Sequence, residues 1–155
     1  MIRAVIRADA SGLVIDDDDA VCHLVTALMT AMGFKNTWSA RDGSEGLRIA
    51  AEKHPDIVVC DVDMSPVDGV MFVSGLRGAL DADLARTPII IFSGHPNIDI
   101  VEKLKNLGVH DFLAKPFTTN LFAMRINEAL GRRMSRYEMD RQVMKWDFEA
   151  GAYKT

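Results

Sequence analysis

The chain has few cysteines, no long apolar run and no recognisable export signal in its 155 residues. Cys22 and Cys60 are too few for a disulfide framework and stand in apolar stretches, so we expect reduced core thiols in a cytoplasmic protein. No stretch approaches the roughly 18 apolar residues of a membrane-spanning helix. Residues 1–12 lack the apolar core and the cleavage site of a secretory signal. We therefore expect neither membrane insertion nor secretion.

Positive charge is also scarce over most of the chain. Residues 12–130 hold 10 Lys/Arg against 17 Asp/Glu, a net charge of −7, whereas residues 131–155 carry a net charge of +2. Nucleic-acid binding needs a basic face that contacts phosphates, so we expect no nucleic acid as the main ligand. The sequence also has no cluster of histidines and cysteines, which argues against a zinc site.

The apolar residues that are present alternate between short continuous runs and segments of helical period. The runs predict strands at residues 12–16, 34–40, 56–60, 87–94 and 110–116. The periodic segments predict helices at residues 19–33, 41–55, 69–80, 97–108 and 118–130. We expect helix N-caps at Asp18 or Asp19, at Asp42 and at Thr118, because these residue types accept hydrogen bonds from the first free N–H groups.

Five alternations of strand and helix predict parallel strands joined by crossover helices. The runs "LVI", "IVV" and "IIIF" are apolar at every position, as expected for strands covered on both faces. We therefore predict an α/β fold, namely a flavodoxin-like, doubly wound five-stranded parallel sheet of order 2-1-3-4-5 with helices on both faces. One domain then fills residues 12–130, with an N-terminal extension at 1–11 and a helical C-terminal extension at 131–155.

Polar side chains stand at the ends of four predicted strands. Asp16 and Asp17 end the first strand, Asp61 ends the third, Ser93 the fourth and Lys115 the fifth. In an open parallel sheet, ligands bind outside the carboxyl ends of the strands, where the strand order reverses. With the order 2-1-3-4-5, the acids of the first and third strands meet at that point, and the serine and the lysine flank them.

Three carboxylates in one place need a counter-charge. Oxygen ligands from acids and a backbone carbonyl suit Mg²⁺, so we expect Mg²⁺ as the cofactor. A metal-bound carboxylate beside a lysine and a hydroxyl can carry phosphoryl chemistry. In such a site Asp61 attacks phosphorus, while Lys115 and the metal neutralise the charge that develops on the phosphoryl oxygens.

Four motifs resemble the receiver domain of bacterial two-component response regulators: "VIDDDDAV", "VVCDVDMSPVDG", "IIIFSG" and "DFLAKPF". Their order and spacing carry the resemblance, which covers roughly residues 12–130. It implies a domain that takes a phosphoryl group from a sensor histidine kinase or a phosphotransfer protein. Such a domain signals to a downstream protein target through a changed binding surface.

The resemblance also assigns roles to the residues at the strand ends. It implies that Asp61 is the phosphoacceptor and that Asp16 and Asp17 are the acidic pair, with Asp17 as the direct metal ligand. The backbone carbonyl of Asp63 completes the protein ligands of the metal. Lys115 matches the lysine of the family, which is followed by proline.

A switch pair follows from the same resemblance. Ser93 matches the switch hydroxyl and Phe112 the switch aromatic, which turns inward when the hydroxyl is drawn to the phosphoryl group. Four features depart from the family pattern: the proline of Met64-Ser65-Pro66 is one place late, Asp63 is acidic, His95 follows Ser93 by two residues, and Phe112 replaces the usual tyrosine. His95 is a further candidate for contact with the phosphoryl group.

Two other functions remain open at this point. "VVCDVDM" also resembles the nucleophile loop of haloacid-dehalogenase-type phosphatases, with Asp61 as nucleophile and Asp63 as acid, although that family places its metal acids downstream. A degenerate receiver that serves only as a binding or dimerisation module is the second alternative. The complete set of acids, hydroxyl and lysine argues against it.

The C-terminal extension carries a heptad-like apolar stripe. Its members are Leu130, Met134, Tyr137, Met144 and Phe148. The stripe suits a last helix that folds back on its own domain, a helix that pairs with a second copy or another partner, or a disordered segment. Residues 131–155 are too few for a helix-turn-helix module, so we expect no DNA-binding domain there.

Overall fold

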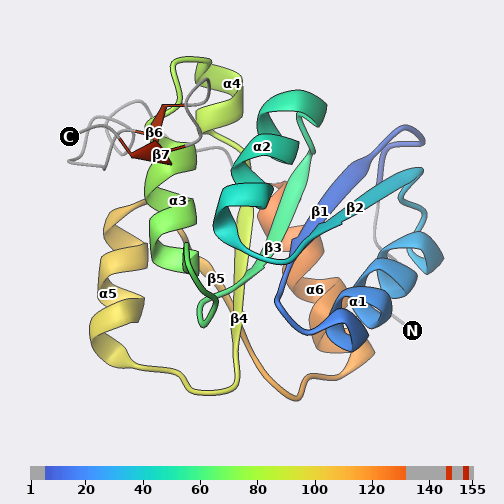
Figure 1. Ribbon diagram of the computed structural model, residues 1–155. Helices are drawn as coiled ribbons and strands as arrows, with labels where there is room; N and C mark the ends of the chain where they lie inside the picture. The colour runs from blue at the N-terminus through green and yellow to red at the C-terminus, as the bar shows by residue number, and fades with distance from the viewer. Residues whose placement is uncertain (1–5, 132–145, 148–151, 154–155) are drawn as a thin grey trace.

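In the computed structural model of the protein, residues 6–131, 146–147 and 152–153 are described. The main body is a five-stranded sheet of order β2-β1-β3-β4-β5, and every pair of neighbouring strands is parallel (Figure 1). Its strands are β1 (Ser11–Ile15), β2 (Asn36–Ala40), β3 (Ile57–Asp61), β4 (Ile89–Ser93) and β5 (Asp111–Ala114). The predicted α/β fold and its strand order are confirmed.

Six helices connect or follow these strands in the described part of the chain. They are α1 (Asp19–Ala31), α2 (Gly43–Lys53), α3 (Gly69–Arg77), α4 (Ala82–Ala85), α5 (Ile98–Asn106) and α6 (Thr119–Leu130). Asp18, Asp42 and Thr118 are N-caps as predicted, and each side chain accepts a backbone N–H of the first turn. The sequence did not predict α4, a single turn that Asp81 caps.

Alternate residues of the central strands β1, β3 and β4 enter two separate hydrophobic cores. In β3, Val58 and Cys60 belong to one core and Ile57 and Val59 to the other. Side chains of α2, α3, α4 and α5 fill the first core, and those of α1 and α6 fill the second. Figure 1 shows α1 and α6 together on one side of the sheet. The continuous apolar runs of the sequence reflect this burial on both faces.

The strand order reverses at β1, which lies between β2 and β3. The chain passes from β1 to β2 through α1 on one face, and from β2 to β3 through α2 on the other. The carboxyl ends of β1 and β3 therefore border the switch point, where ligands bind in folds of this type.

The buried side chain of Arg77 in α3 connects helices on the face of the sheet opposite α1. The Arg77 side chain donates hydrogen bonds to the carbonyl oxygens of Leu107 (3.0 Å), Ala85 (2.9 Å) and Thr87 (2.7 Å). One residue thus holds the end of α5, the end of α4 and the approach to β4. Hydrogen bonds from a charged group contribute more than neutral ones, which favours a fixed position for α5.

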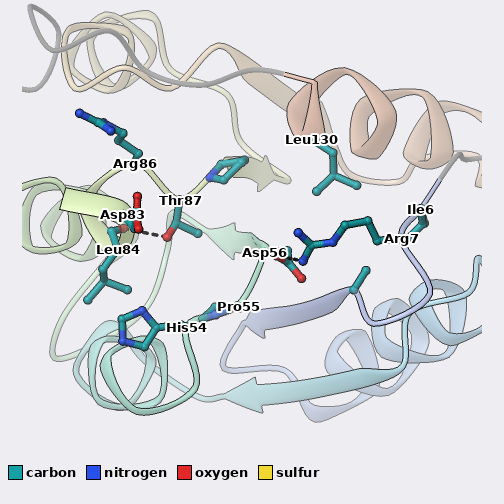
Figure 2. Close-up of a pocket in the computed structure, with 12 residues that line it drawn as sticks. Ile6, Arg7, His54, Pro55, Asp56, Asp83, Leu84, Arg86, Thr87 and Leu130 are labelled. Carbon is teal, nitrogen blue, oxygen red and sulfur yellow. Dashed lines mark hydrogen bonds and ion pairs between the residues drawn. The ribbon is translucent and has the colours of Figure 1, made fainter. Parts of the chain in front are cut away.

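The amino ends of the strands form a second, separate region. Arg7 donates to Asp56 over 2.8 Å, and Asp56 accepts the Ser11 N–H over 2.8 Å. Arg7 and Asp56 border a hollow of about 410 Å³ (Figure 2). Ser11 begins β1, so the sheet starts one residue earlier than the boundary predicted at residue 12.

Four described residues of the C-terminal extension form a β-ladder. Trp146–Asp147 (β6) pairs antiparallel with Ala152–Tyr153 (β7). The helix expected for 131–155 is therefore wrong for these four residues, where the strand preference of Trp and Tyr opposes the heptad pattern. The stripe residues Met134, Tyr137, Met144 and Phe148 lie outside the described residues. Among the helices that are described, none is long and apolar enough to cross a membrane.

Candidate functional site

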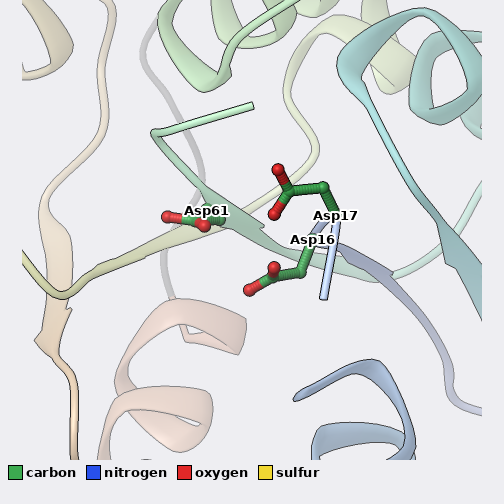
Figure 3. Close-up of side chains that lie close together, drawn as sticks. All are labelled: Asp16, Asp17 and Asp61. Carbon is green, nitrogen blue, oxygen red and sulfur yellow. The ribbon is translucent and has the colours of Figure 1, made fainter. Parts of the chain in front are cut away.

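Three carboxylates converge at the carboxyl end of the sheet. Asp16 and Asp17 follow β1, and Asp61 is the last residue of β3 (Figure 3). One carboxylate oxygen of each lies within 4.8 Å of the others. Asp16 and Asp61 are 1% and 5% exposed, whereas Asp17 faces solvent. The site is thus a buried acidic pair with a third, accessible acid at its mouth.

Lys115 links the two buried acids. Its Nζ donates to Asp16 Oδ2 over 2.7 Å and to Asp61 Oδ2 over 3.3 Å. Its backbone N–H donates to the Ser93 carbonyl over 2.9 Å, so the lysine is tied to the end of β4 as well. Lys115, which follows β5, is therefore bonded to the ends of β1 and β3 through its side chain and to the end of β4 through its backbone.

Backbone N–H groups orient both buried acids. Asp16 Oδ1 accepts the Asp18 N–H over 2.8 Å, at the residue that caps α1. Asp61 Oδ1 accepts the Asp63 N–H over 3.3 Å, in the loop that leaves β3. Each acid therefore turns one oxygen to its own loop and the other to Lys115. Asp63 itself is exposed, so its backbone rather than its carboxylate takes part in this arrangement.

The charges of the site change its proton affinities. Burial raises the pKa of Asp61 above its ordinary value, Asp16 adds to the rise, and Lys115 opposes it. Burial would lower the pKa of Lys115, but the hydrogen bonds and charges of Asp16 and Asp61 outweigh it, and the pKa is raised. Lys115 therefore stays an ammonium at neutral pH. The ionised form of Asp61, by contrast, is disfavoured by burial and by the nearby charge of Asp16.

The donor set fits a hard divalent cation. The three carboxylates of the cluster outnumber the one ammonium, which contacts Asp16 and Asp61, so negative charge is in excess, and every side-chain ligand atom of the cluster is an oxygen. Mg²⁺ prefers such ligands and keeps several waters, which the exposed side of Asp17 allows. The nearby thiols are free and buried, and burial raises the pKa of Cys22 to about 11. Protonated thiols do not compete for the metal.

The predicted switch residues lie beside this centre, around one cavity. Ser93 is nearly buried, and its Oγ accepts the His95 N–H over 3.1 Å. Phe112 is half-buried and lines a cavity of about 270 Å³ together with Ser93, His95 and Leu104 of α5. The cavity thus lies between the end of β4 and α5, and the ring of Phe112 forms part of its wall.

Hydrogen bonds define the path of the loop after β3. The sequence did not predict this path, because Pro66 stands one place later than in the family pattern. The Gly69 N–H donates to the Val62 carbonyl, and the Gly43 N–H donates to the Val67 carbonyl, both over 2.9 Å. A Cβ at Gly69 would overlap the carbonyl oxygen of Asp61 and lie 2.8 Å from the Cα of Val62. Glycine therefore allows α3 to begin directly against the end of β3.

Gly69→Ala is expected to lower the free energy of unfolding by about 1–3 kcal/mol, because the new methyl group meets backbone that must move. Gly94→Ala is the matched control, since a Cβ there meets no described heavy atom within 4 Å. Urea unfolding followed by circular dichroism measures both. Equal stability of the two variants would contradict the close approach at Gly69.

Phe92 belongs to the site, although the sequence marks it only as an apolar strand residue. It pairs in register with Asp61 on the neighbouring strand, and the Lys115 Nζ lies 4.4 Å from its ring centroid. An apolar residue in a continuous run carries no signal for such a contact. Only the register of β3 and β4, which sequence reasoning did not provide, places this ring under the ammonium.

These features define a class before any comparison. A parallel sheet of order 2-1-3-4-5, with acids, a lysine and a hydroxyl at its switch point, is a flavodoxin-like α/β domain with an acidic ligand site. The model of the response regulator receiver domain matches residues 13–127, and the chain belongs to this family of two-component signalling proteins.

Known proteins agree with this assignment. The chain is 30% identical over 135 residues to the transcriptional regulatory protein KdpE of Mycobacterium tuberculosis, which covers 87% of the chain and 57% of that protein. It is 29% identical to a probable chemotaxis protein CheY of Rhizobium etli, covering 77% of the chain and 91% of that protein. The chain spans little more than half of the first of these relatives.

A solved structure shows the same fold. The chemotaxis protein CheY4 of Vibrio cholerae superposes with a TM-score of 0.72 at 24% sequence identity, covering 79% of this chain and 99% of that one. The haloacid-dehalogenase alternative loses its support, because the sheet order, the family match and this likeness all favour the receiver.

Proposed function

We propose that this receiver domain accepts a phosphoryl group on Asp61, with Mg²⁺, from a sensor histidine kinase or a phosphotransfer protein in the cytoplasm. It then signals to a downstream protein target and does not act as a turnover enzyme. The observation that carries the proposal is the position of Lys115, which bonds both Asp16 and Asp61 while Asp17 remains accessible.

The transfer step follows from the chemistry of the acceptor. An oxygen of Asp61 forms a bond to phosphorus as the bond between phosphorus and the donor imidazole nitrogen breaks, and that nitrogen keeps the electron pair. Asp16, Asp17, Asp61 and the Asp63 carbonyl would hold Mg²⁺, which supplies positive charge to the phosphoryl oxygens. Lys115 brings a second, fixed positive charge, since its raised pKa keeps it protonated.

The signal then passes to the surface through the switch pair. The hydroxyl of Ser93 turns from the His95 N–H to the phosphoryl group, and the ring of Phe112 moves into the cavity that both residues line. This motion changes the surface of α5, β5 and α6, where Ile98 is 76% exposed. A local charge event thereby biases a surface with two states.

Intact mass spectrometry after incubation with acetyl phosphate and Mg²⁺ tests the proposal. We expect the wild type to gain one phosphoryl group and Asp61→Asn to gain none. Asp99→Asn, which changes an exposed aspartate of α5, is the control and should be modified like the wild type.

Two results would contradict the proposal. One is uptake that survives Asp61→Asn. The other is a lack of uptake both from acetyl phosphate and from a phosphorylated histidine donor protein. Steady turnover of p-nitrophenyl phosphate would point to a phosphatase instead.

A further inference from the structure

The aromatic ring of Phe92 contacts the ammonium of Lys115 from the side of the hydrophobic core. Phe92 of β4 is fully buried, and the Lys115 Nζ lies over its ring face at 4.4 Å from the centroid. The register of β3 and β4 sets the ring beside Asp61, whose carboxylate is the weaker of the two lysine partners. The ring therefore contacts the cation from within the hydrophobic core that α1 and α6 cover.

Two more rings fix the orientation of Phe92. Phe117 meets Phe92 edge-on at a centroid distance of 6.3 Å and an interplanar angle of 81°. Phe122 of α6 stacks on Phe117 at 5.6 Å and 20°. This aromatic stack (Phe92, Phe117 and Phe122) lies in the core shared with α1 and α6. Offset and edge-to-face contacts of this kind are favourable geometries, so the face of Phe92 stays turned to Lys115.

Lys115 needs such support because its hydrogen bonds are unequal. The ammonium lies 2.7 Å from Asp16 and 3.3 Å from Asp61, on a side chain with several rotatable bonds. Hydrogen bonding alone favours a shift toward Asp16, away from the acceptor. The ring face attracts the cation from a third direction, and the attraction is stronger at a site such as this one, where the lysine side chain is only 23% exposed.

We propose that Phe92 is a positioning residue for phosphoryl transfer, which holds the Lys115 ammonium between Asp16 and Asp61 through the face of its ring. Phe117 and Phe122 keep that face in place. The proposal rests on the proposed function of Asp61 as acceptor. The phenyl ring has no polar atom to offer the donor or the phosphoryl group, so its effect on the transfer passes through the ammonium of Lys115.

The test measures the rate of phosphoryl uptake from acetyl phosphate at saturating Mg²⁺. Phe92→Leu removes the ring face and is expected to lower the rate about tenfold. Phe72→Leu is the matched control, because Phe72 is equally buried on the opposite face of the sheet. The Mg²⁺ concentration for half-maximal rate should stay the same in both variants, since neither substitution removes a side chain that would bind the metal.

A fluorinated series separates the electrostatic role from simple packing. A difluorinated and then a trifluorinated phenylalanine at position 92 keep the shape of the ring while weakening the negative charge of its face. We expect the rate to fall stepwise along this series. In the Lys115→Gln background the same series should leave the residual rate unchanged, because the cation that the ring holds is absent.

The outcomes distinguish this inference from the function on which it rests. If the wild type takes up no phosphoryl group, the proposed function fails and the inference falls with it. If the wild type is phosphorylated at Asp61 but the fluorinated variants keep the wild-type rate, the inference alone is overturned. The fluorinated variants preserve core packing, so this result does not depend on whether Phe92→Leu folds.

Discussion

Lys115→Met is expected to lower the free energy of unfolding of the metal-free protein by about 3 kcal/mol, because removal of one partner from a buried ion pair leaves uncompensated charge. Asp16 and Asp61 are 1% and 5% exposed, and the Lys115 ammonium contacts both. Neither carboxylate can regain water without opening the loops that orient it. Urea unfolding in the presence of a chelator measures the effect.

Mg²⁺ should restore more stability to Lys115→Met than to the wild type, because the metal takes over part of the role of the missing counter-charge. Lys35→Met serves as the control. Lys35 is an exposed lysine before β2, and its loss should change stability by less than about 0.5 kcal/mol. A loss at Lys115 no larger than at Lys35 would show that the acids do not depend on the ammonium.

The sheet could be predicted from the sequence because each central strand contains a continuous apolar run that ends in a polar residue. "IVVC" followed by Asp61 is an example: the strand predicted at residues 56–60 is β3 at Ile57–Asp61 in the structure, a shift of one residue. Helix starts were predicted equally well where a capping side chain was present, as at Asp42. The four-residue helix α4 was missed because one turn is too short to show a helical period.

The acids and the lysine of the site could be predicted because charged residues at the ends of buried strands stand out. The buried side chains that hold these residues and the neighbouring helices in place could not be predicted. Phe92 and Arg77 make contacts that depend on register and on distant segments, and neither contact leaves a pattern in the nearby sequence. The heptad stripe after residue 130 also misled the prediction for β6 and β7, since a pattern of apolar spacing does not weigh strand preference.

The ionised carboxylate of Asp61 lowers the free energy of unfolding of the metal-free protein. Burial and the nearby Asp16 raise the pKa of Asp61 in spite of Lys115. The folded protein therefore binds this proton more tightly than the unfolded chain does. Between the unfolded and the folded pKa the folded state carries more protons, so stability falls as pH rises through that window and stays lower above it.

Asp61→Asn is accordingly expected to raise the free energy of unfolding of the metal-free protein by about 1 kcal/mol at neutral pH. Asparagine does not ionise, and Lys115 keeps its partner Asp16 at 2.7 Å, so no charge is left unpaired. The gain should vanish at a pH below the unfolded pKa of aspartate, where the wild-type carboxyl is protonated in both states. Urea unfolding across this pH range, with chelator present, measures it.

Saturating Mg²⁺ should reverse the order of the two proteins. The wild type gains binding free energy from the metal, whereas Asp61→Asn has lost one of the carboxylates that would hold it. Asp99→Asn should match the wild type under both conditions, because its side chain is exposed on α5. The opposite result would contradict this prediction: a metal-free Asp61→Asn variant that is less stable than the wild type at neutral pH. It would mean that Lys115 stabilises the ionised carboxylate of Asp61 by more than burial destabilises it.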